Sequence, residues 1–521
     1  MNMPHLPIVD IFAGPGGLGE GFCAFRKYGS YPFKISLSVE KDPSAWNTLY
    51  LRSFFRQFRY AGLKIPQEYY KHVHNPMKFS RDQLFNLFPS QAHQTGDETW
   101  HAELGTKFTD SKLKHKIEKA LAGQKDWLLI GGPPCQAYSC IGRSRNKGIV
   151  NYKPEEDARH FLYMEYLSII SQFWPSVFVM ENVKGILSSK IQNVEIFLRI
   201  RADLQNPGKI TGRPRKHKYR LFSLITDKSP DDLTPSDFII CAENYRIPQA
   251  RHRVIILGIR DDVIQKGIIP RILKKGKGLV HTEDVLSLPH LRSGFSCNSP
   301  IEDSWENWRL FMYDSLREPW IEELPDRLRD IIKHTAERIY KRKYKMKRVP
   351  DCLGRKPNFQ PNWFWDSKLR SVLNHEARSH REDDLYRYLF ASCYTRIYHE
   401  SPKLRDFPKE LLPAHRNAIE AAQAKHSLFG DRFRVQGKGR PSTTVTSHIS
   451  KDGHYFIHPD PTQCRSLTVR EAARLQTFPD NYFFCGTRTN QYVQVGNAVP
   501  PLLAIQIAGI VWPVFQQFLE K

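Results

Sequence analysis

The stretch that decides the fold is IVDIFAGPGGLGEGF, at residues 8–22. Its first five residues are mostly apolar and predict a buried strand, which leads directly into a glycine-rich turn and a helix. Glycines at such a junction let the backbone approach a ligand closely, and the first N–H groups of the helix point at that ligand. We therefore predict a ligand site where the first strand ends.

A second predicted strand, at residues 34–40, ends on Glu40. Gly14, Gly16 and Gly19 together with this acid have the spacing of a dinucleotide-binding fingerprint, in which a carboxylate about 20 residues further on holds the ribose hydroxyls. The pattern does not separate NAD from other adenosine-bearing cofactors, because all of them carry the ribose. A tight glycine turn without a ligand is the alternative.

A third stretch, LLIGGPPCQAYS at residues 128–139, joins an apolar run to two glycines, two prolines and Cys135. Proline fixes its own φ and restricts the residue before it, so the thiol leaves the strand end at a set angle. Open α/β sheets keep their chemistry outside the carboxyl ends of their strands. Cys135 is therefore a candidate nucleophile, although lone cysteines are usually small core residues.

Residues 176–183 predict another strand, and Glu181 follows its apolar run. A carboxyl group in that position can hold or deliver a proton near neutral pH. A strand-end glutamate can also be a cap or a member of an ion pair. Further strands of the same sheet are predicted at residues 219–225 and 237–242.

The segment QARHR, at residues 249–253, leads into a hydrophobic strand. Side chains alternate along a strand, so Gln249, Arg251 and Arg253 are expected to share one face. Two arginines that point the same way favour an anionic partner such as a phosphate or a carboxylate. Surface ion pairing is the alternative.

The chain has 521 residues, enough for two or three domains, and a formal net charge of +24. This surplus favours a polyanionic partner, although a merely basic soluble protein is the alternative. The nine cysteines include no Cys-x-x-Cys pair, which favours a reducing compartment and argues against structural zinc. We expect no signal peptide, and no run of about 18 apolar residues predicts a membrane span.

Strands alternate with helices over residues 1–260, which predicts an α/β fold with a parallel, doubly wound sheet. Residues 261–439 are irregular and rich in proline, tryptophan and basic residues. Within them, RIYKRKYKMKR at residues 338–348 interleaves basic and aromatic side chains, which favours nucleic-acid contact, although a solvated helix face looks similar. A second basic segment, GRSRNKG at residues 142–148, predicts either a loop that closes over a phosphate backbone or an ordinary solvated loop.

Two further patterns concern helix capping and metal binding. Thr468 and Glu471 form the Thr-x-x-Glu pattern of a capping box and predict a helix start. His375 and His380 frame a His-Glu-x-x-x-His sequence, which does not match the His-Glu-x-x-His spacing of zinc proteases. We therefore predict no metal site.

Taken together, these motifs resemble those of a DNA (cytosine-5-)-methyltransferase of the prokaryotic restriction–modification type. The matching blocks occur in the family's order at residues 10–22, 40, 131–139, 181–183, 249–253, 440–479 and 496–497. The resemblance implies an α/β, Rossmann-like, doubly wound methyltransferase sheet with a second, smaller, irregular target recognition domain. We expect a catalytic domain at residues 1–262 plus 466–521 and a recognition domain at residues 263–465.

The resemblance also implies the chemistry. The thiolate of Cys135 would add to C6 of cytosine, and Glu181 would protonate N3 and stabilise the adduct. Arg253 would lie at the O2 side of the base, with Arg251 and Gln249 organising the pocket. The activated C5 would then take the methyl group of S-adenosyl-L-methionine, leaving S-adenosyl-L-homocysteine, with no metal involved.

For the cofactor, the family's pattern places Glu40 on the ribose and Leu162 beside the methionine moiety. The other matching positions are Phe12, Ala13, Gly14, Gly16, Gly17, Leu18, Pro133, Asn497 and Ala498. The acid that contacts adenine is not clearly matched, and Asp97 and Glu103 both remain candidates.

A stacked cytosine is out of reach of this chemistry, so we expect the base to be flipped out of double-stranded DNA. The predicted DNA-binding residues are Ser139, Arg143, Arg145, Lys341, Arg342 and Lys343. We expect a cytoplasmic, nucleoid-associated monomer without a membrane anchor, whose cognate restriction endonuclease acts separately.

Three other interpretations compete with this one. An RNA cytosine methyltransferase would use the same scaffold, but the long segment 261–439 and the Ala-Tyr-Ser sequence after Gln136 favour a DNA enzyme. A catalytically silent binding protein would not need every chemical position intact. An NAD dehydrogenase would explain only the first forty residues.

Overall fold

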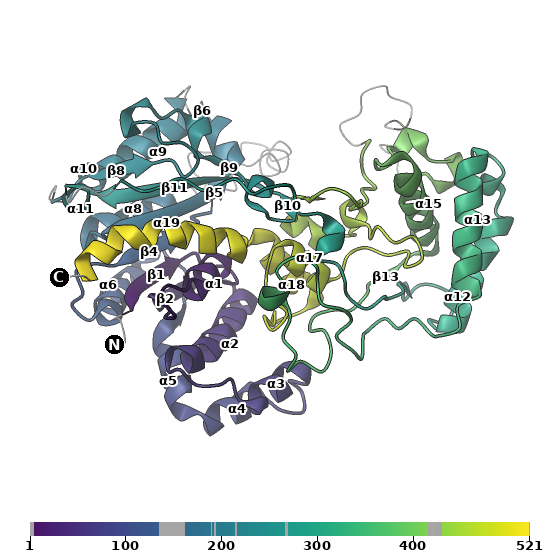
Figure 1. The fold of residues 1–521 in the computed structure, drawn as a ribbon, viewed down its shortest axis with the longest axis horizontal. Coiled ribbons are helices and arrows are strands. Elements are labelled where there is room, and N and C mark those ends of the chain that lie inside the picture. The colour runs from purple at the N-terminus through teal and green to yellow at the C-terminus, as the bar shows by residue number, and fades with distance from the viewer. Residues whose placement is uncertain are drawn as a thin grey trace. The chain divides into compact units, whose positions relative to one another are not determined.

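A mixed sheet of eight strands organises the first part of the chain. The computed structural model describes residues 5–134, 162–188, 190–191, 194–213, 216–265, 269–414, 420, 422 and 430–519. It divides into two compact units (Figure 1). Unit 1 is Met1–Gly278, Phe484–Gly486 and Ala498–Lys521, and unit 2 is Leu279–Phe483 and Thr487–Asn497.

The strand order of the unit 1 sheet is β3-β2-β1-β4-β5-β11-β8, and β9 also pairs with β11. The strands are β1 (Leu6–Ile11), β2 (Phe33–Glu40), β3 (Thr99–His101), β4 (Leu128–Gly131), β5 (Val177–Val183), β8 (Tyr219–Phe222), β9 (Ile239–Cys241) and β11 (His252–Arg260). A small separate hairpin joins β6 (Lys190–Ile191) to β7 (Val194–Glu195).

The prediction of a wholly parallel sheet is wrong at one edge. Strands β3, β2, β1, β4 and β5 are parallel to their neighbours, but β11 runs antiparallel to β5, β8 and β9. The connection from β9 to β11, residues 242–251, contains no crossover helix. Parallel neighbours need a crossover connection, usually a helix, whereas antiparallel neighbours do not.

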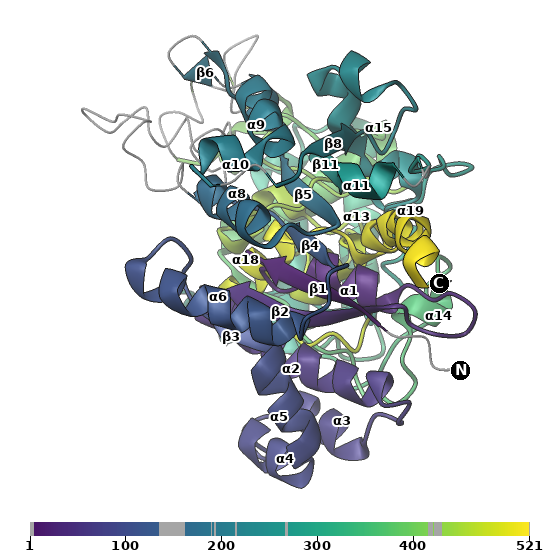
Figure 2. The same ribbon diagram turned by 90° about the vertical axis from the view of Figure 1, so that its left-hand side faces the viewer.

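Helices cover both faces of this sheet, so the doubly wound architecture is confirmed (Figure 2). Ile8 of β1 packs in one apolar core with α1 (Gly17–Ala24) and α19 (Pro501–Leu519). Val9, its neighbour, packs in the other core with α6 (Lys107–Leu121) and α8 (Leu162–Phe173). Successive side chains of a strand point to opposite faces, so a strand that is apolar throughout needs a helical layer on each side.

Phe197 and Val263 of these cores come from the remaining helices of unit 1. These helices are α2 (Pro43–Tyr60), α3 (Gln67–His74), α4 (Arg81–Leu87), α5 (Pro89–Glu98), α9 (Ile196–Gln205), α10 (Pro207–Ile210) and α11 (Asp261–Ile264). Buried ion pairs hold α2 in place, because Arg52 contacts Glu20 at 2.5 Å and Arg56 contacts Glu98 at 2.5 Å.

Unit 2 has long connections and short strands around its own apolar core. Its helices are α12 (Trp305–Asp314), α13 (Asp326–Tyr340), α14 (Pro361–Phe364), α15 (Glu382–Tyr398), α17 (Val469–Leu475) and α18 (Arg488–Asn497). Its strands are β12 (Gly294–Phe295), β13 (Ser379–His380) and β14 (Ser442–Thr443). The predicted capping box is confirmed, since Thr468 and Glu471 cap α17 reciprocally.

The boundaries of the two compact units differ from the boundaries of the predicted catalytic and recognition domains. The break after Gly278 lies 16 residues beyond the predicted end of the catalytic domain at residue 262. Residues 466–483 and Thr487–Asn497 belong to unit 2 rather than to unit 1, because α17 and α18 pack within unit 2. The assignment of a function to each segment stays a prediction.

Among the described residues, one helical stretch, Arg488–Gln516, meets the length and hydropathy criteria for a membrane span, and 72% of its apolar window is buried. Its C-terminal part lies in α19, which contributes Leu503, Ile507, Val511 and Phe515 to the core of unit 1. Core helices of soluble proteins meet the same criteria.

Candidate active site

The glycine turn after β1 is tied directly to the end of β2. The backbone N–H of Gly14 donates a hydrogen bond to Oε2 of Glu40 at 2.7 Å. The N–H of Asp42 donates to Oε1 of the same carboxylate at 2.8 Å, and that of Ala13 donates to the Val39 carbonyl at 3.2 Å. Glu40, only 9% exposed, is therefore held in place by backbone donors.

The backbone of this turn leaves room for a ligand. Phe12, Gly14 and Gly16 have φ angles of 55°, 57° and 87°, in the left-handed region that favours glycine. A Cβ placed on Gly14 would meet nothing within 4 Å. Helix α1 starts after Gly16 without a side-chain cap, so its first N–H groups can face an anion or a polar ligand.

Gly19 lies against a buried acid that the sequence reasoning overlooked. A Cβ on Gly19 would come within 2.8 Å of Oδ2 of Asp10, so the close packing of α1 on β1 requires glycine here. Burial raises the pKa of Asp10 to about 8, against the opposing attraction of Arg56. The signal in the sequence that could have identified Asp10 is an acid in the middle of an otherwise apolar strand.

Glu181 and Arg253 meet at the end of β5. Nε of Arg253 lies 3.0 Å from Oε1 of Glu181, and their side chains are 16% and 13% exposed. The antiparallel register sets Arg253 opposite Val183 and Ile255 opposite Glu181. Burial lowers the pKa of the Arg253 guanidinium, and the neighbouring carboxylate of Glu181 opposes that shift. The structure thus brings these two predicted site residues together.

The residues that follow β4 contact the end of β5, where Glu181 and Arg253 meet. Nδ2 of Asn182 donates to the Pro133 carbonyl at 3.2 Å. A Cβ on Gly132 would lie 3.1 Å from Oε2 of Glu181. The segment that leads to residue 135 therefore starts beside the Glu181 carboxylate. Cys135, Ser139, Arg143 and Arg145 lie outside the described residues.

The predicted single strand through QARHR is interrupted. Strand β10 (Gln249–Ala250) ends before β11 begins at His252, and the N–H of Arg251 bonds back to the Gln249 carbonyl at 2.9 Å. Gln249 and Arg251 are buried. Burial lowers the pKa of Arg251 well below its usual value, with repulsion from Arg253 adding to the shift and Glu181 opposing it. These charged groups therefore belong to one electrostatic cluster.

The other predicted cofactor residues are spread over several elements. Gly17 and Leu18 lie buried in the first turn of α1, and Leu162 is the half-buried first residue of α8. Ala498 is buried in unit 1, whereas Asn497 is the exposed last residue of α18 in unit 2.

The two candidate acids for adenine lie in different surroundings. Asp97, in α5, pairs with Lys119 at 2.6 Å, and it precedes β3. Glu103 follows β3 and pairs with Lys41 at 3.2 Å. Because β2 and β3 are parallel and pair Glu40 with His101, Glu103 leaves the sheet at the same edge as Glu40. This placement favours Glu103.

The predicted DNA contacts in unit 2 are partly engaged with the protein itself. Lys341 follows α13 and pairs with Glu337 at 2.7 Å. Arg342 stacks on the ring of Tyr344 at 4.5 Å and lies 3.4 Å from Nδ1 of His290. Lys343 is exposed and has no ion pair among the described residues.

The His-Glu-x-x-x-His segment makes contacts within the protein. His375 lies between Oγ1 of Thr468 at 2.7 Å and the Pro289 carbonyl at 3.0 Å, and His380 contacts Tyr388 and Ser466. Elsewhere in the described residues, two half-buried groups have metal-ligand chemistry and spacing: Cys241, Glu243 and His252, and His217, Asp261 and Asp262.

Comparisons with known proteins identify the family of this chain. A family model described as C-5 cytosine-specific DNA methylase matches residues 90–208 and 236–511, more than half of the chain. Type II methyltransferase M.Bpa9945I of Bacillus paralicheniformis is 32% identical, covering 97% of this chain and 98% of its own. DNA (cytosine-5-)-methyltransferase M.ApeKI of Aeropyrum pernix is 26% identical, over 74% and 81%.

Among solved structures, a putative DNA modification methyltransferase encoded in an Escherichia coli prophage aligns with a TM-score of 0.49 and 18% identity, covering 98% of this chain and 99% of its own. The family match and the 32% identity over nearly the full length place the chain in a known group. The chain belongs to the C-5 cytosine-specific DNA methylase family.

Proposed function

We propose that this protein is a type II restriction–modification enzyme that transfers the methyl group of S-adenosyl-L-methionine to C5 of a cytosine in DNA. The observation that carries the proposal is the half-buried pair of Glu181 and Arg253, whose Oε1 and Nε atoms lie 3.0 Å apart. This pair lies beside the strand end that leads to Cys135. The names of the relatives support the restriction–modification role.

The reaction needs an activated ring, because C5 of cytosine is a poor nucleophile. The thiolate of Cys135 adds to C6, and Glu181 provides the proton at N3 that stabilises the adduct. Arg253 orients the Glu181 carboxylate and donates to O2 of the base, with Arg251 and Gln249 organising the pocket. Loss of the C5 proton after methyl transfer then allows the Cys135 thiolate to leave.

The glycine turn fits an adenosine-bearing cofactor. The open space above Gly14 and the buried Glu40 carboxylate are what a ribose needs, with Glu103 proposed near the adenine and Leu162, Asn497 and Ala498 as further contacts. S-adenosyl-L-methionine, when bound, supplies an electrophilic methyl group. The chain's own residues orient it and exclude water.

A target cytosine reaches this site only when it is flipped out of double-stranded DNA. The cost of a few kcal/mol has to be offset by contacts to phosphates and bases. The net charge of +24 supports such contacts. We propose that residues 263–465 form the recognition domain and that residues 1–262 and 466–521 form the catalytic domain. We place the monomeric enzyme in the cytoplasm, with a separate endonuclease.

Trapping on 5-fluorocytosine DNA tests the covalent step. Fluorine at C5 cannot leave as a proton does, so wild-type protein with S-adenosyl-L-methionine is expected to form an adduct that survives denaturing electrophoresis. Cys135→Ser is expected to lose both adduct and turnover but still bind DNA. Cys140→Ser is the matched control and is expected to form the adduct. Absence of the wild-type adduct would refute the mechanism.

A further inference from the structure

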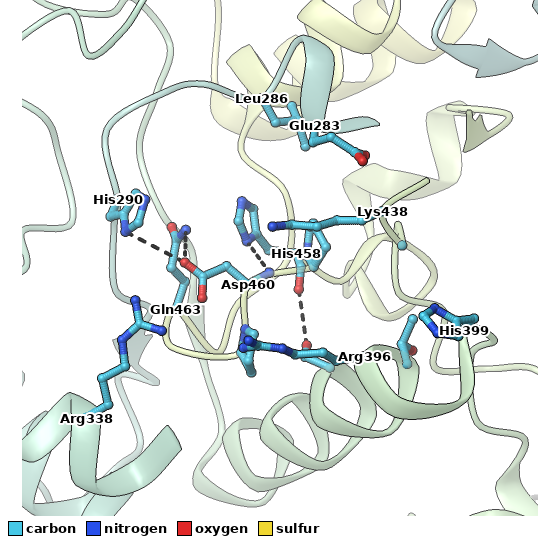
Figure 3. A pocket seen from close by; sticks show the side chains of 15 residues that line it. Glu283, Leu286, His290, Arg338, Arg396, His399, Lys438, His458, Asp460 and Gln463 are labelled. Atoms are coloured by element: carbon cyan, nitrogen blue, oxygen red, sulfur yellow. Dashed lines mark hydrogen bonds and ion pairs between the residues drawn. The ribbon is translucent and has the colours of Figure 1, made fainter. Parts of the chain in front are cut away.

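Unit 2 contains a cavity of about 490 Å³ whose walls come from distant parts of the chain. Helix α13 contributes Arg338, and helix α15 contributes Thr395 and Arg396 (Figure 3). The other walls are the segment around Lys438 and the loop that contains Asp460. A cavity of this size can hold a nucleotide-sized group.

Three cations extend toward the middle of this cavity from different elements (Figure 3). They are Arg338, Arg396 and Lys438, all of which are exposed. None of them has a carboxylate partner in the part of unit 2 that the structure describes. Cations that line one cavity and outnumber its carboxylates favour the binding of an anion.

The two carboxylates of the cavity already have hydrogen-bond donors. Glu283 accepts from the N–H of Gly439 at 3.0 and 3.1 Å. Asp460 accepts from the N–H and hydroxyl of Thr462 at 3.0 and 2.9 Å, and from Nε2 of Gln463 at 3.1 Å. Three cations against two carboxylates leave the cavity with an excess positive charge.

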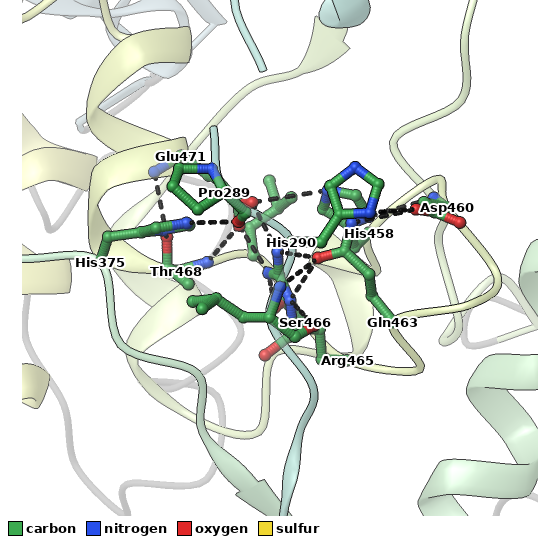
Figure 4. A network of polar contacts seen from close by, with 12 residues as sticks. Pro289, His290, His375, His458, Asp460, Gln463, Arg465, Ser466, Thr468 and Glu471 are labelled. Atoms are coloured by element: carbon green, nitrogen blue, oxygen red, sulfur yellow. Dashed lines mark hydrogen bonds and ion pairs between the residues drawn. The ribbon is translucent and has the colours of Figure 1, made fainter. Parts of the chain in front are cut away.

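A buried polar network holds the wall around Asp460 in place (Figure 4). Oε1 of Gln463 accepts from the N–H of Leu291 at 3.0 Å and from Nη2 of Arg465 at 2.6 Å. The Arg465 guanidinium also donates twice to Glu471, at 2.7 Å each. A wall fixed in this way presents its groups without further ordering when a ligand binds.

A hydroxyl at the wall has an unused hydrogen-bonding capacity. Thr395 is 6% exposed, and its Oγ1 has no hydrogen-bond partner among the described residues. Buried hydroxyls are usually paired. A Cβ on Gly437 would lie 3.2 Å from Cγ2 of Thr395, so the methyl group of this side chain packs against the Gly437 backbone.

We propose that this cavity binds a phosphate group. Guanidinium groups match the oxygens of a phosphate in pairs, a lysine adds a point charge, and a hydroxyl can donate to a further oxygen. Either the DNA backbone or a free phosphate-bearing molecule can supply the group. The first source rests on the proposed function, and the second does not.

Binding of inorganic phosphate is measured first, without DNA. The melting temperature of the full chain is followed against phosphate concentration, with chloride at matched ionic strength as the reference. We expect a saturable rise for wild type and an apparent affinity at least about 10-fold weaker for Arg338→Gln/Arg396→Gln. The control Arg317→Gln/Arg381→Gln removes two exposed arginines that are paired with Asp314 and Asp383.

The control is expected to respond to phosphate as wild type does, and circular dichroism checks that both variants fold. If the cavity variant responds to phosphate as wild type and control do, or if wild type shows no saturable rise, the proposal is overturned.

Thr395→Val gives a second test inside the wall, because it keeps the shape of the side chain and removes the hydroxyl. It is expected to weaken phosphate binding without changing the net charge.

The salt dependence of DNA binding then identifies the source of the phosphate. Each lost phosphate contact lowers the slope of log K against log salt by about 1. A fall of about 2 in the cavity variant, but not in the control, assigns the DNA backbone. An unchanged slope with weakened phosphate binding assigns a free phosphate-bearing molecule. Failure of wild type to methylate DNA would refute the proposed function and leave the phosphate result standing.

Discussion

The two units differ in which groups form hydrogen bonds with their buried backbone N–H and C=O groups. In unit 1 the paired strands bond to one another, and apolar side chains such as Ile8 and Val9 fill the space between sheet and helices. In unit 2 the strands are only two residues long, and buried arginines bond to the carbonyls of the connections. Buried carbonyl groups need donors, and an irregular chain has to take them from side chains.

Arg470 and Arg474 illustrate this use of arginine. Arg470 donates to the carbonyls of Leu373 and Pro479 at 2.9 Å each. Arg474 donates to Asp480 at 2.9 and 2.8 Å and to the Val285 carbonyl at 2.7 Å. Each guanidinium joins segments that are far apart in sequence. Unit 2 is therefore more dependent on individual polar side chains than the sheet of unit 1.

The largest effect is expected from Glu471→Ala. This change leaves Arg465 buried without its carboxylate partner, which typically costs about 3–5 kcal/mol. Hydrogen exchange read by mass spectrometry is expected to show faster exchange across unit 2, with unit 1 unchanged. The control Glu337→Ala breaks an exposed pair with Lys341 and is expected to cost less than about 1 kcal/mol. A small effect of Glu471→Ala would contradict the comparison.

A smaller effect in the other unit is expected from Gly21→Ala. The new Cβ would lie 2.3 Å from Cβ of Ala504 and 2.5 Å from the Pro501 carbonyl, which forces α1 away from α19. Such overpacking typically costs about 1–3 kcal/mol. Urea denaturation, with hydrogen exchange to locate the change, checks this value. Gly509→Ala on α19 meets only Phe25 at 3.4 Å and is expected to change little, so equal losses would refute the packing argument.

The smallest effect, taken per group and per pH unit, concerns pH, for which Asp10 of unit 1 and two histidines of unit 2 are expected to act with opposite sign. Between about pH 4 and 8, Asp10 holds a proton in folded unit 1 that the unfolded chain lacks, so the contribution of Asp10 to the stability of unit 1 rises as the pH falls. Burial lowers the pKa of His375 and of His458 to about 4. Between about pH 4 and 6.5, these two histidines therefore bind protons in the unfolded chain that they do not bind in folded unit 2, and their contribution to its stability falls as the pH falls.

Each such group changes the stability by at most about 1.4 kcal/mol per pH unit. Hydrogen exchange compared at two pH values, after correction for intrinsic rates, measures the change in each unit. Asp10→Asn is expected to remove its share of the gain in unit 1 and to leave the loss in unit 2 unchanged. Identical pH responses of wild type and Asp10→Asn in unit 1 would show that Asp10 does not carry the difference.

Local patterns in the sequence predicted several elements because they depend on neighbours in the chain. The apolar run before Gly14 predicted β1, the run before Glu181 predicted β5, and Thr468 with Glu471 predicted the start of α17. The antiparallel edge could not be predicted in the same way. The hydrophobic run of β11 looks the same in either direction, and only its partners decide which one it takes.

The sequence by itself determined the types of chemistry that this protein carries: a thiol after a strand, a carboxylate after another, and a surplus of positive charge. Only the tertiary structure decided which groups meet, such as Glu181 with Arg253 and the three cations around the cavity of unit 2. The physical reason is that contact between residues far apart in the chain depends on strand register and packing, whereas residue type and periodicity are local properties.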